Sequence, residues 1–191
     1  MDKLIFTKPK RKVHTVFLHC SASDNLTHDD IEVVKKWHTL PKMPKEIKVK
    51  IKNRELPNSE NFKYGNGWSD VGYHYYITKD CEIQTGRDLE KTPAAQKGHN
   101  TGSIAICCGG LNEFSENQLN LLKSFCYAIN DAYNRKVKFR GHCEVDKNKT
   151  CPIFNYKKLL NLNKSGKIKK NNVLVFLLKL IEFIKKWKKN D

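Results

Sequence analysis

Residues 67–78 read GWSDVGYHYYIT, and the second half of this stretch is rich in aromatic and β-branched side chains. Such side chains favour a β-strand, and Lys79 and Asp80 directly after them form a candidate turn. The short segment 81–85 then returns with the sequence CEIQT. Together the two segments predict a β-hairpin.

Three further segments have the composition of short strands. Residues 13–20 and 103–108 are apolar runs, VHTVFLHC and SIAICC, of the length expected for strands that are buried on both faces. Residues 137–140 predict a shorter strand that leads into Gly141 and His142.

Helical patterns occupy the intervening sequence. Thr27, with Asp30 three residues later, predicts an N-cap for a helix that ends before Pro41. A capping box and an apolar stripe predict a long helix over 116–133, and residues 154–162 also have a helical pattern. Alternating strands and helices predict an α/β fold: one domain with a central mixed β-sheet flanked by helices.

The chain of 191 residues has the length of one domain, which we place at residues 13–162. Within it, residues 41–66 combine Pro, Gly, Lys and Asn without periodicity and predict a loop insertion. Residues 1–12 form a basic N-terminal arm. Residues 163–191 comprise a polar joint and a basic amphipathic C-terminal helix over 173–189, whose apolar run is too short to span a membrane. This helix either docks on the domain or contacts an anionic membrane or lipopolysaccharide.

The formal net charge of +16 predicts attraction to polyanions such as nucleic acid, anionic lipid or an acidic cell-wall polymer. Residues 1–12 carry +4 and residues 164–191 carry +7, which leaves +5 for the 151 residues between them. With so little charge on the domain and no nucleic-acid-binding motif, we expect no specific nucleic acid partner. We also expect a monomer.

The seven cysteines are irregularly spaced and contain no CxxC pair, which argues against a disulfide framework. The first twelve residues have no apolar run of signal-peptide length. We therefore expect a protein made in a reducing cytoplasm, with thiols available as metal ligands or as core residues.

Three residues stand out as candidate metal ligands: His19 at the end of the first strand, His142, and Cys151 before a proline. Two imidazoles and one thiolate form a recurrent zinc set, which leaves a fourth position open for water. The competing interpretation is that each is a buried structural residue, as Cys107, Cys108 and Cys126 are expected to be. Cys143 also competes with the adjacent His142, and we favour His142.

Four segments, in the same order along the chain, resemble those of the zinc N-acetylmuramoyl-L-alanine amidases of type 2. This family includes phage lysozyme-like endolysins and peptidoglycan recognition proteins. The GWSDVGYHY segment resembles the GW-x-D-[IV]-GYH-[FY] motif, and the others resemble the first-ligand strand, the G-x-N-x-x-SI segment and the final H…K-x-CP segment. They are residues 67–75, 16–22, 98–104 and 141–152.

The resemblance implies a site and a reaction. His19, His142 and Cys151 would bind Zn²⁺, Tyr73 would lie over the bound water, and Lys149 would reach the scissile carbonyl. Zinc lowers the pKa of its bound water from ~15.7 toward ~7 and polarises an amide oxygen. A tyrosine hydroxyl can orient that water or pass a proton, and a lysine can stabilise an oxyanion. The division of work between these two residues stays open.

The bond implied is the amide between N-acetylmuramic acid and L-alanine in peptidoglycan, and a phage-type endolysin is the favoured type. It would wait in the cytoplasm before release to the cell wall. A cytosolic wall-recycling amidase is the first alternative, but that group typically has Asp as third ligand where this chain has Cys151. The second alternative is a receptor that binds peptidoglycan without cutting it, which lacks the cysteine.

The chain departs from the family pattern in three places. Ala95 stands where the family commonly has a histidine, the stretch 41–66 is unusually long, and the segment from His142 to Cys151 is one residue longer. Because of this extra residue, Lys147 is an alternative to Lys149 as the lysine that reaches the scissile carbonyl.

Overall fold

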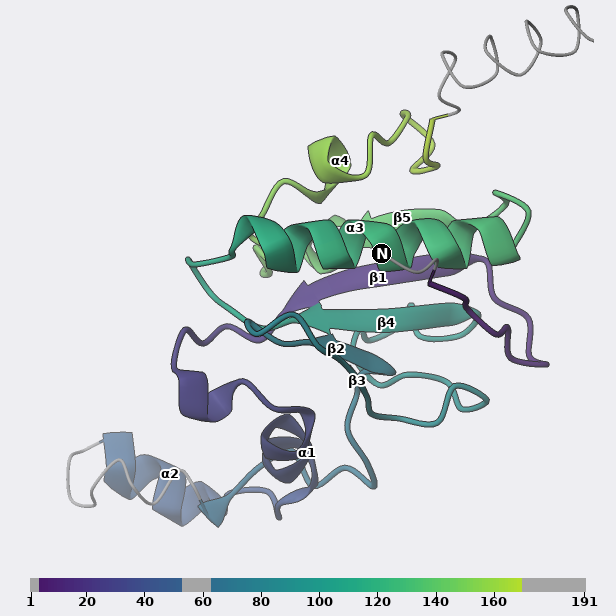
Figure 1. The fold of residues 1–191 in the computed structure, drawn as a ribbon. Helices are drawn as coiled ribbons and strands as arrows, with labels where there is room; N and C mark the ends of the chain where they lie inside the picture. Colours follow the sequence, from purple (N-terminus) through teal and green to yellow (C-terminus); the bar gives the residue numbers. More distant parts are fainter. Residues whose placement is uncertain (1–3, 53–62, 170–191) are drawn as a thin grey trace, which may run out of the picture.

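The computed structural model describes residues 4–52 and 63–169, and it contains a five-stranded mixed sheet in the order β3-β2-β4-β1-β5 (Figure 1). Within this sheet, β4 pairs in parallel with β1 and β2, β5 pairs in parallel with β1, and β2 and β3 form an antiparallel hairpin. The strands are β1 (Thr15–Cys20), β2 (Tyr75–Ile77), β3 (Ile83–Thr85), β4 (Ser103–Cys108) and β5 (Lys138–Gly141). The α-helices are α1 (Ile31–Thr39), α2 (Lys45–Lys52), α3 (Glu116–Ala132) and α4 (Tyr156–Leu159).

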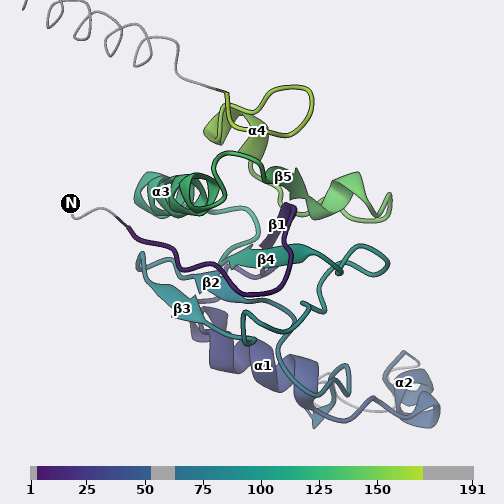
Figure 2. The ribbon, with the colours of Figure 1, turned by 90° about the vertical axis from the view of Figure 1, so that its right-hand side faces the viewer.

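The sheet lies between two unequal helical layers, with α3 on one face and α1 on the other (Figure 2). Alternate residues of β1 and β4, such as Val16, Leu18 and Ile106, are fully buried in the core under α3. The opposite alternation places Cys107 in a smaller cluster with Ile31 of α1. His19 pairs in register with Cys107. Its side chain therefore lies on the α1 face, at the carboxyl end of β1.

The long helix α3 confirms its predicted cap, since the side chain of Ser115 accepts a hydrogen bond from the backbone N–H of Gln118. The predicted cap at Thr27 is wrong. Asn25 caps a short 3-10 helix, Leu26–His28, and Asp30 itself caps α1 by accepting from the backbone N–H of Glu32. An aspartate at an extended position satisfies an otherwise free N–H of the first turn, which is why the helix begins there.

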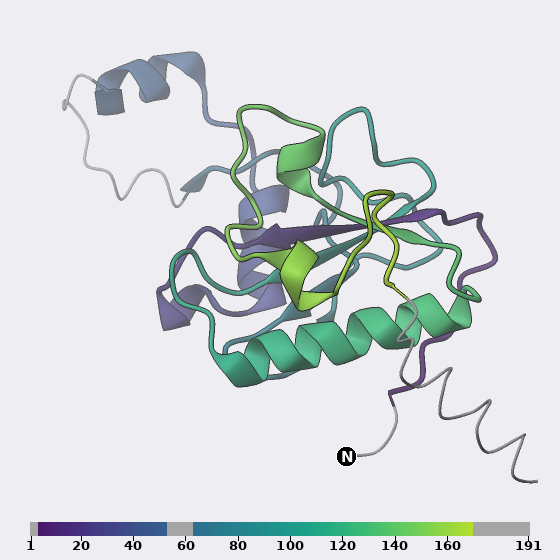
Figure 3. The same cartoon turned by 90° about the horizontal axis from the view of Figure 1, so that it is seen from above.

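The stretch 41–66 is not loop throughout, because its first part contains α2. This helix extends away from the sheet, as the view from above shows (Figure 3). Lysine is a good helix former, so a turn of helix after Pro44 needs little tertiary packing. The two ends of the stretch lie side by side. Lys42 and Gly65 form an isolated parallel β-bridge, and the backbone N–H of Trp68 donates to the carbonyl of His38 at 2.8 Å.

Residues that precede and follow the predicted domain, 13–162, also contact the core. Phe6 packs edge-on against Tyr75 and Phe125, and Ile168 is also buried in the cluster beneath α3. The predicted helix over 154–162 is shorter, since only α4 forms there. The predicted C-terminal helix over 173–189 lies outside the described residues. Among the residues that are described, no helix combines the length and apolar character needed to cross a bilayer.

Candidate metal centre

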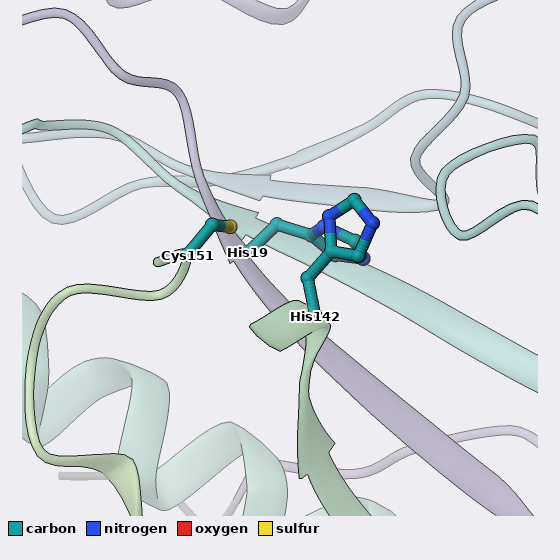
Figure 4. Close-up of side chains that lie close together, drawn as sticks. All are labelled: His19, His142 and Cys151. Carbon is teal, nitrogen blue, oxygen red and sulfur yellow. The ribbon is translucent and has the colours of Figure 1, made fainter. Parts of the chain in front are cut away.

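The three predicted ligands meet at the carboxyl ends of β1 and β5. His19 is the fifth residue of β1, His142 directly follows β5, and Cys151 comes from the loop before α4. One ligand atom from each lies within 4.8 Å of the others. Figure 4 shows the side chains of His19, His142 and Cys151 close together. Parallel strands present their carboxyl ends at one edge of a sheet, which is where α/β proteins place their sites.

His19 is prepared as a neutral ligand. Its side chain is 1% exposed, and burial followed by the nearby His142 lowers its pKa to about 3. The Nε2 atom lies 3.1 Å from the amide oxygen of Gln96, whereas Nδ1 is buried without a hydrogen-bond partner. A buried polar atom without a hydrogen-bond partner destabilises the fold unless a bound ligand supplies the missing interaction. A cation that accepts the Nδ1 lone pair fits this position.

Cys151 lies beside Cys20, whose backbone N–H donates to the Cys151 sulfur at 3.1 Å. The hydrogen bond with the Cys20 thiol, followed by burial, raises the pKa of Cys151. A coordinated cation is what converts such a thiol into a thiolate. The donor set of two neutral imidazoles and one thiol therefore fits Zn²⁺.

The loop that follows β5 separates His142 from its competitor. His142 begins a 3-10 helix, His142–Glu144, and it belongs to the cluster of candidate ligands, whereas Cys143 does not. The backbone N–H of Cys143 donates to the carbonyl of Cys151 at 2.8 Å and ties the two ends of the loop together. Burial, and then the positive charge of Lys149, lowers the pKa of His142. Lys149 itself is exposed.

Tyr73 lies against the same cluster, with its ring centroid 5.1 Å from that of His19. Burial is the main cause that raises its pKa well above the usual value, so the hydroxyl keeps its proton at neutral pH. His38 supports this segment: its Nδ1 accepts from the backbone N–H of Gly72 at 3.0 Å, and its ring packs on Trp68 and Tyr73. The hydroxyl of Tyr73 can therefore act as a hydrogen-bond donor beside the candidate ligands.

His74 points to the other side of the hairpin and has a structural role. It is 1% exposed, its Nδ1 accepts from the backbone N–H of Ala105 at 3.0 Å, and its Nε2 donates to the carbonyl of Lys91 at 2.9 Å. Arg11 Nη2 lies 3.2 Å from the same Nε2 atom. Burial is the main cause that lowers the pKa of His74 to about 4.

This lowered pKa predicts a loss of stability in mild acid. An unfolded histidine binds a proton below about pH 6.5, whereas folded His74 does so only below about 4. The stabilisation is complete above pH 6.5 and falls as the pH drops toward 4, by about 2 kcal/mol at pH 5. Thermal unfolding of metal-free protein at pH 7 and pH 5 measures it. His74→Asn keeps an acceptor for Ala105 but cannot titrate, so it should lose less stability over this range; equal losses would contradict the prediction.

Gln96 and Cys20 contact the candidate ligands, yet neither was singled out in the sequence. Gln96 lies 77 residues from His19 in a loop without periodicity, so no local pattern indicates their contact. Cys20 adjoins His19 in sequence, but its contact with Cys151 spans 131 residues. Both contacts arise from the order of the strands.

The chain belongs to the N-acetylmuramoyl-L-alanine amidase family, which matches residues 9–154. This membership confirms the enzyme class expected from the four motif segments: the protein is a peptidoglycan-degrading amidase. Among its relatives are phage endolysins. The endolysin of Enterobacteria phage T3 is 29% identical over 166 residues, which cover 83% of this chain and 91% of the relative. That of Escherichia phage T7 is 28% identical over 159 residues, with 79% and 87% covered.

Solved structures confirm the fold. The Ph2119 endolysin from a Thermus scotoductus bacteriophage superposes with a TM-score of 0.55 at 18% identity and covers 84% of this chain and 90% of its own. The N-acetylmuramoyl-L-alanine amidase LysC from Clostridium intestinale gives a TM-score of 0.53 at 20% identity, with 84% and 96% covered. The expected α/β architecture, a central mixed sheet with flanking helices, is therefore that of this chain.

Proposed function

We propose that the protein is a zinc-dependent endolysin, which hydrolyses the amide bond between the lactyl group of N-acetylmuramic acid and L-alanine of the stem peptide. His19, His142 and Cys151 hold the zinc ion in this proposal. The observation that carries it is that one ligand atom from each of these three side chains lies within 4.8 Å of the others, in a cluster that includes buried His19 with its unpartnered Nδ1. Each of them is also a ligand that zinc prefers.

When bound, zinc polarises an amide carbonyl and lowers the pKa of a water molecule, so that hydrolysis becomes possible at neutral pH. The chain supplies the remaining functions. The protonated hydroxyl of Tyr73 donates a hydrogen bond beside the ligands and can hold the attacking water or the developing oxyanion. The ammonium of exposed Lys149, whose positive charge acts on His142, stabilises negative charge on the scissile carbonyl. Cys151, absent from non-cutting receptors by the resemblance, favours catalysis over recognition alone.

The substrate and place of action follow from the same assignment. An endolysin is made in the cytoplasm and acts on the cell wall from within, and the +16 charge suits a polymer that carries anionic groups. We propose that residues 13–162, together with flanking residues such as Phe6 and Ile168 that pack into the same core, act as the catalytic unit and as a monomer. Residues 1–12 and 163–191 add basic charge, and contact of residues 173–189 with an anionic membrane or lipopolysaccharide is part of the proposal.

Removal of the metal tests the function directly. Purified peptidoglycan is incubated with the protein, and new N-terminal L-alanine is measured as the product that only this cleavage releases. We expect chelation to abolish release and stoichiometric Zn²⁺ to restore it, whereas Mg²⁺ should not, because it prefers oxygen ligands. Release that persists without metal would contradict the zinc site. Cleavage at another bond, seen by mass spectrometry, would contradict the proposed substrate position.

A further inference from the structure

A fully buried carboxamide lies directly behind the candidate ligand His19. Gln96 is 0% exposed, and its Oε1 lies 3.1 Å from Nε2 of His19. We propose that Gln96 is a positioning residue of the metal site: it holds His19 as the Nε2–H tautomer and so keeps the Nδ1 lone pair available to the metal. This inference rests on the proposed zinc site and adds a residue that acts through a ligand.

The hydrogen-bond network behind Gln96 determines which way its amide faces. The hydroxyl of Ser103 donates to the carbonyl of Asn100 at 2.7 Å. Its oxygen must therefore accept from Nε2 of Gln96, which lies 2.7 Å away. The carbonyl of His99, at 3.5 Å, is a second acceptor beside the same nitrogen. With its nitrogen committed to two acceptors, the Gln96 amide presents only its oxygen to His19.

An oxygen at this place requires that Nε2 of His19 carries the proton. A neutral imidazole has one N–H and one lone pair, so the lone pair is then on Nδ1. This is the atom that is buried without a hydrogen-bond partner. It belongs to the side chain that meets His142 and Cys151 in the ligand cluster. The tautomer needed for metal binding is thus set before any metal arrives.

The segment that carries Gln96 is itself held in place. The backbone N–H groups of Ala95 and Gln96 both donate to the side-chain oxygen of Asn100, at 3.1 and 3.0 Å. Ser103 is 0% exposed and begins β4, where it pairs with Thr15 of β1. The network therefore connects the loop to the same two strands that carry and support His19, and a rigid partner of this kind costs little to order on binding.

Partners that orient a ligating histidine typically contribute 10–100-fold to metal affinity. We therefore expect Gln96→Leu, which has no acceptor, to bind zinc about 10–100-fold more weakly in a chelator competition with the full-length protein. Gln96→Glu restores an acceptor and should bind zinc at least as tightly as the wild type. Gln118→Leu is the matched control, because Gln118 is also fully buried but donates to the carbonyls of Ile77 and Gly109. Its zinc affinity should be unchanged whatever its stability.

The tautomer gives a second readout that does not need activity. Nitrogen-15 chemical shifts of His19 in the metal-free protein should report Nε2–H in the wild type and a mixture of tautomers in Gln96→Leu. If that variant fails to fold, Ser103→Ala replaces it, because loss of this acceptor lets the Gln96 amide rotate and should weaken zinc binding several-fold. Wild-type affinity together with a wild-type tautomer in the substituted protein would overturn the role of Gln96. Failure of the wild type itself to bind zinc would instead overturn the proposed metal site.

Discussion

Cys151→Ser is expected to abolish zinc binding and to reduce the release of L-alanine from peptidoglycan by about 10³-fold or more. A serine hydroxyl does not ionise at neutral pH, so the substitution removes the only anionic ligand of the proposed set. Loss of several kcal/mol of transition-state stabilisation corresponds to such a change in rate. Zinc content after dialysis and single-turnover release of L-alanine measure the two effects independently.

Cys143→Ser is the matched control for this substitution. Cys143 is partly buried and adjoins His142, but it is not a member of the ligand cluster. We expect its zinc content to be complete and its activity to lie within about twofold of the wild type, as is usual for a substitution that removes no key contact. Loss of zinc in Cys143→Ser with retention in Cys151→Ser would show that the ligand assignment is wrong.

Tyr73→Phe should separate catalysis from metal binding. The substitution keeps the ring that packs beside His19 and removes only the hydroxyl. Loss of one donor to a developing oxyanion, or of a proton donor, typically lowers kcat by about 10²–10³. We expect a loss of this size with unchanged zinc affinity. Full activity in Tyr73→Phe would exclude a catalytic hydroxyl.

Lys149→Met should have a smaller effect on kcat, of about tenfold, because solvent and salt screen an exposed ammonium. Lys147→Met is its matched control, since it removes the same charge two residues earlier in the chain and should leave kcat unchanged. A larger loss in Lys147→Met than in Lys149→Met would transfer the role to Lys147. The pH profiles of Tyr73→Phe and Lys149→Met then assign the proton-transfer step, because loss of the group that moves the proton removes one limb of the profile.

Much of the fold was predictable from local patterns. The apolar runs of β1 and β4 and the capped stripe of α3 carry their own signals, since burial on both faces of a strand or on one face of a helix appears directly in the residue order. The signal was weakest where structure depends little on core packing. Helix α2 was missed because its lysine-rich sequence shows no sustained helical periodicity of apolar residues. The cap of α1 was misplaced because Thr27 and Asp30 both have side chains that can cap a helix.

The sequence by itself determined the types of residue available for chemistry and their order along the chain. The motif segments around His19, Tyr73, His142 and Cys151 identify the amidase family without any coordinates. Only the tertiary structure decided which neighbours act on these residues. Gln96 contacts His19 across 77 residues of sequence, and Cys20 contacts Cys151 across 131 residues. Contacts at such sequence separations leave no periodic pattern in the residue order. Parallel pairing of β1 with β4 and β5 brings these remote loops to one edge of the sheet, and there the tautomer of the buried His19 is set.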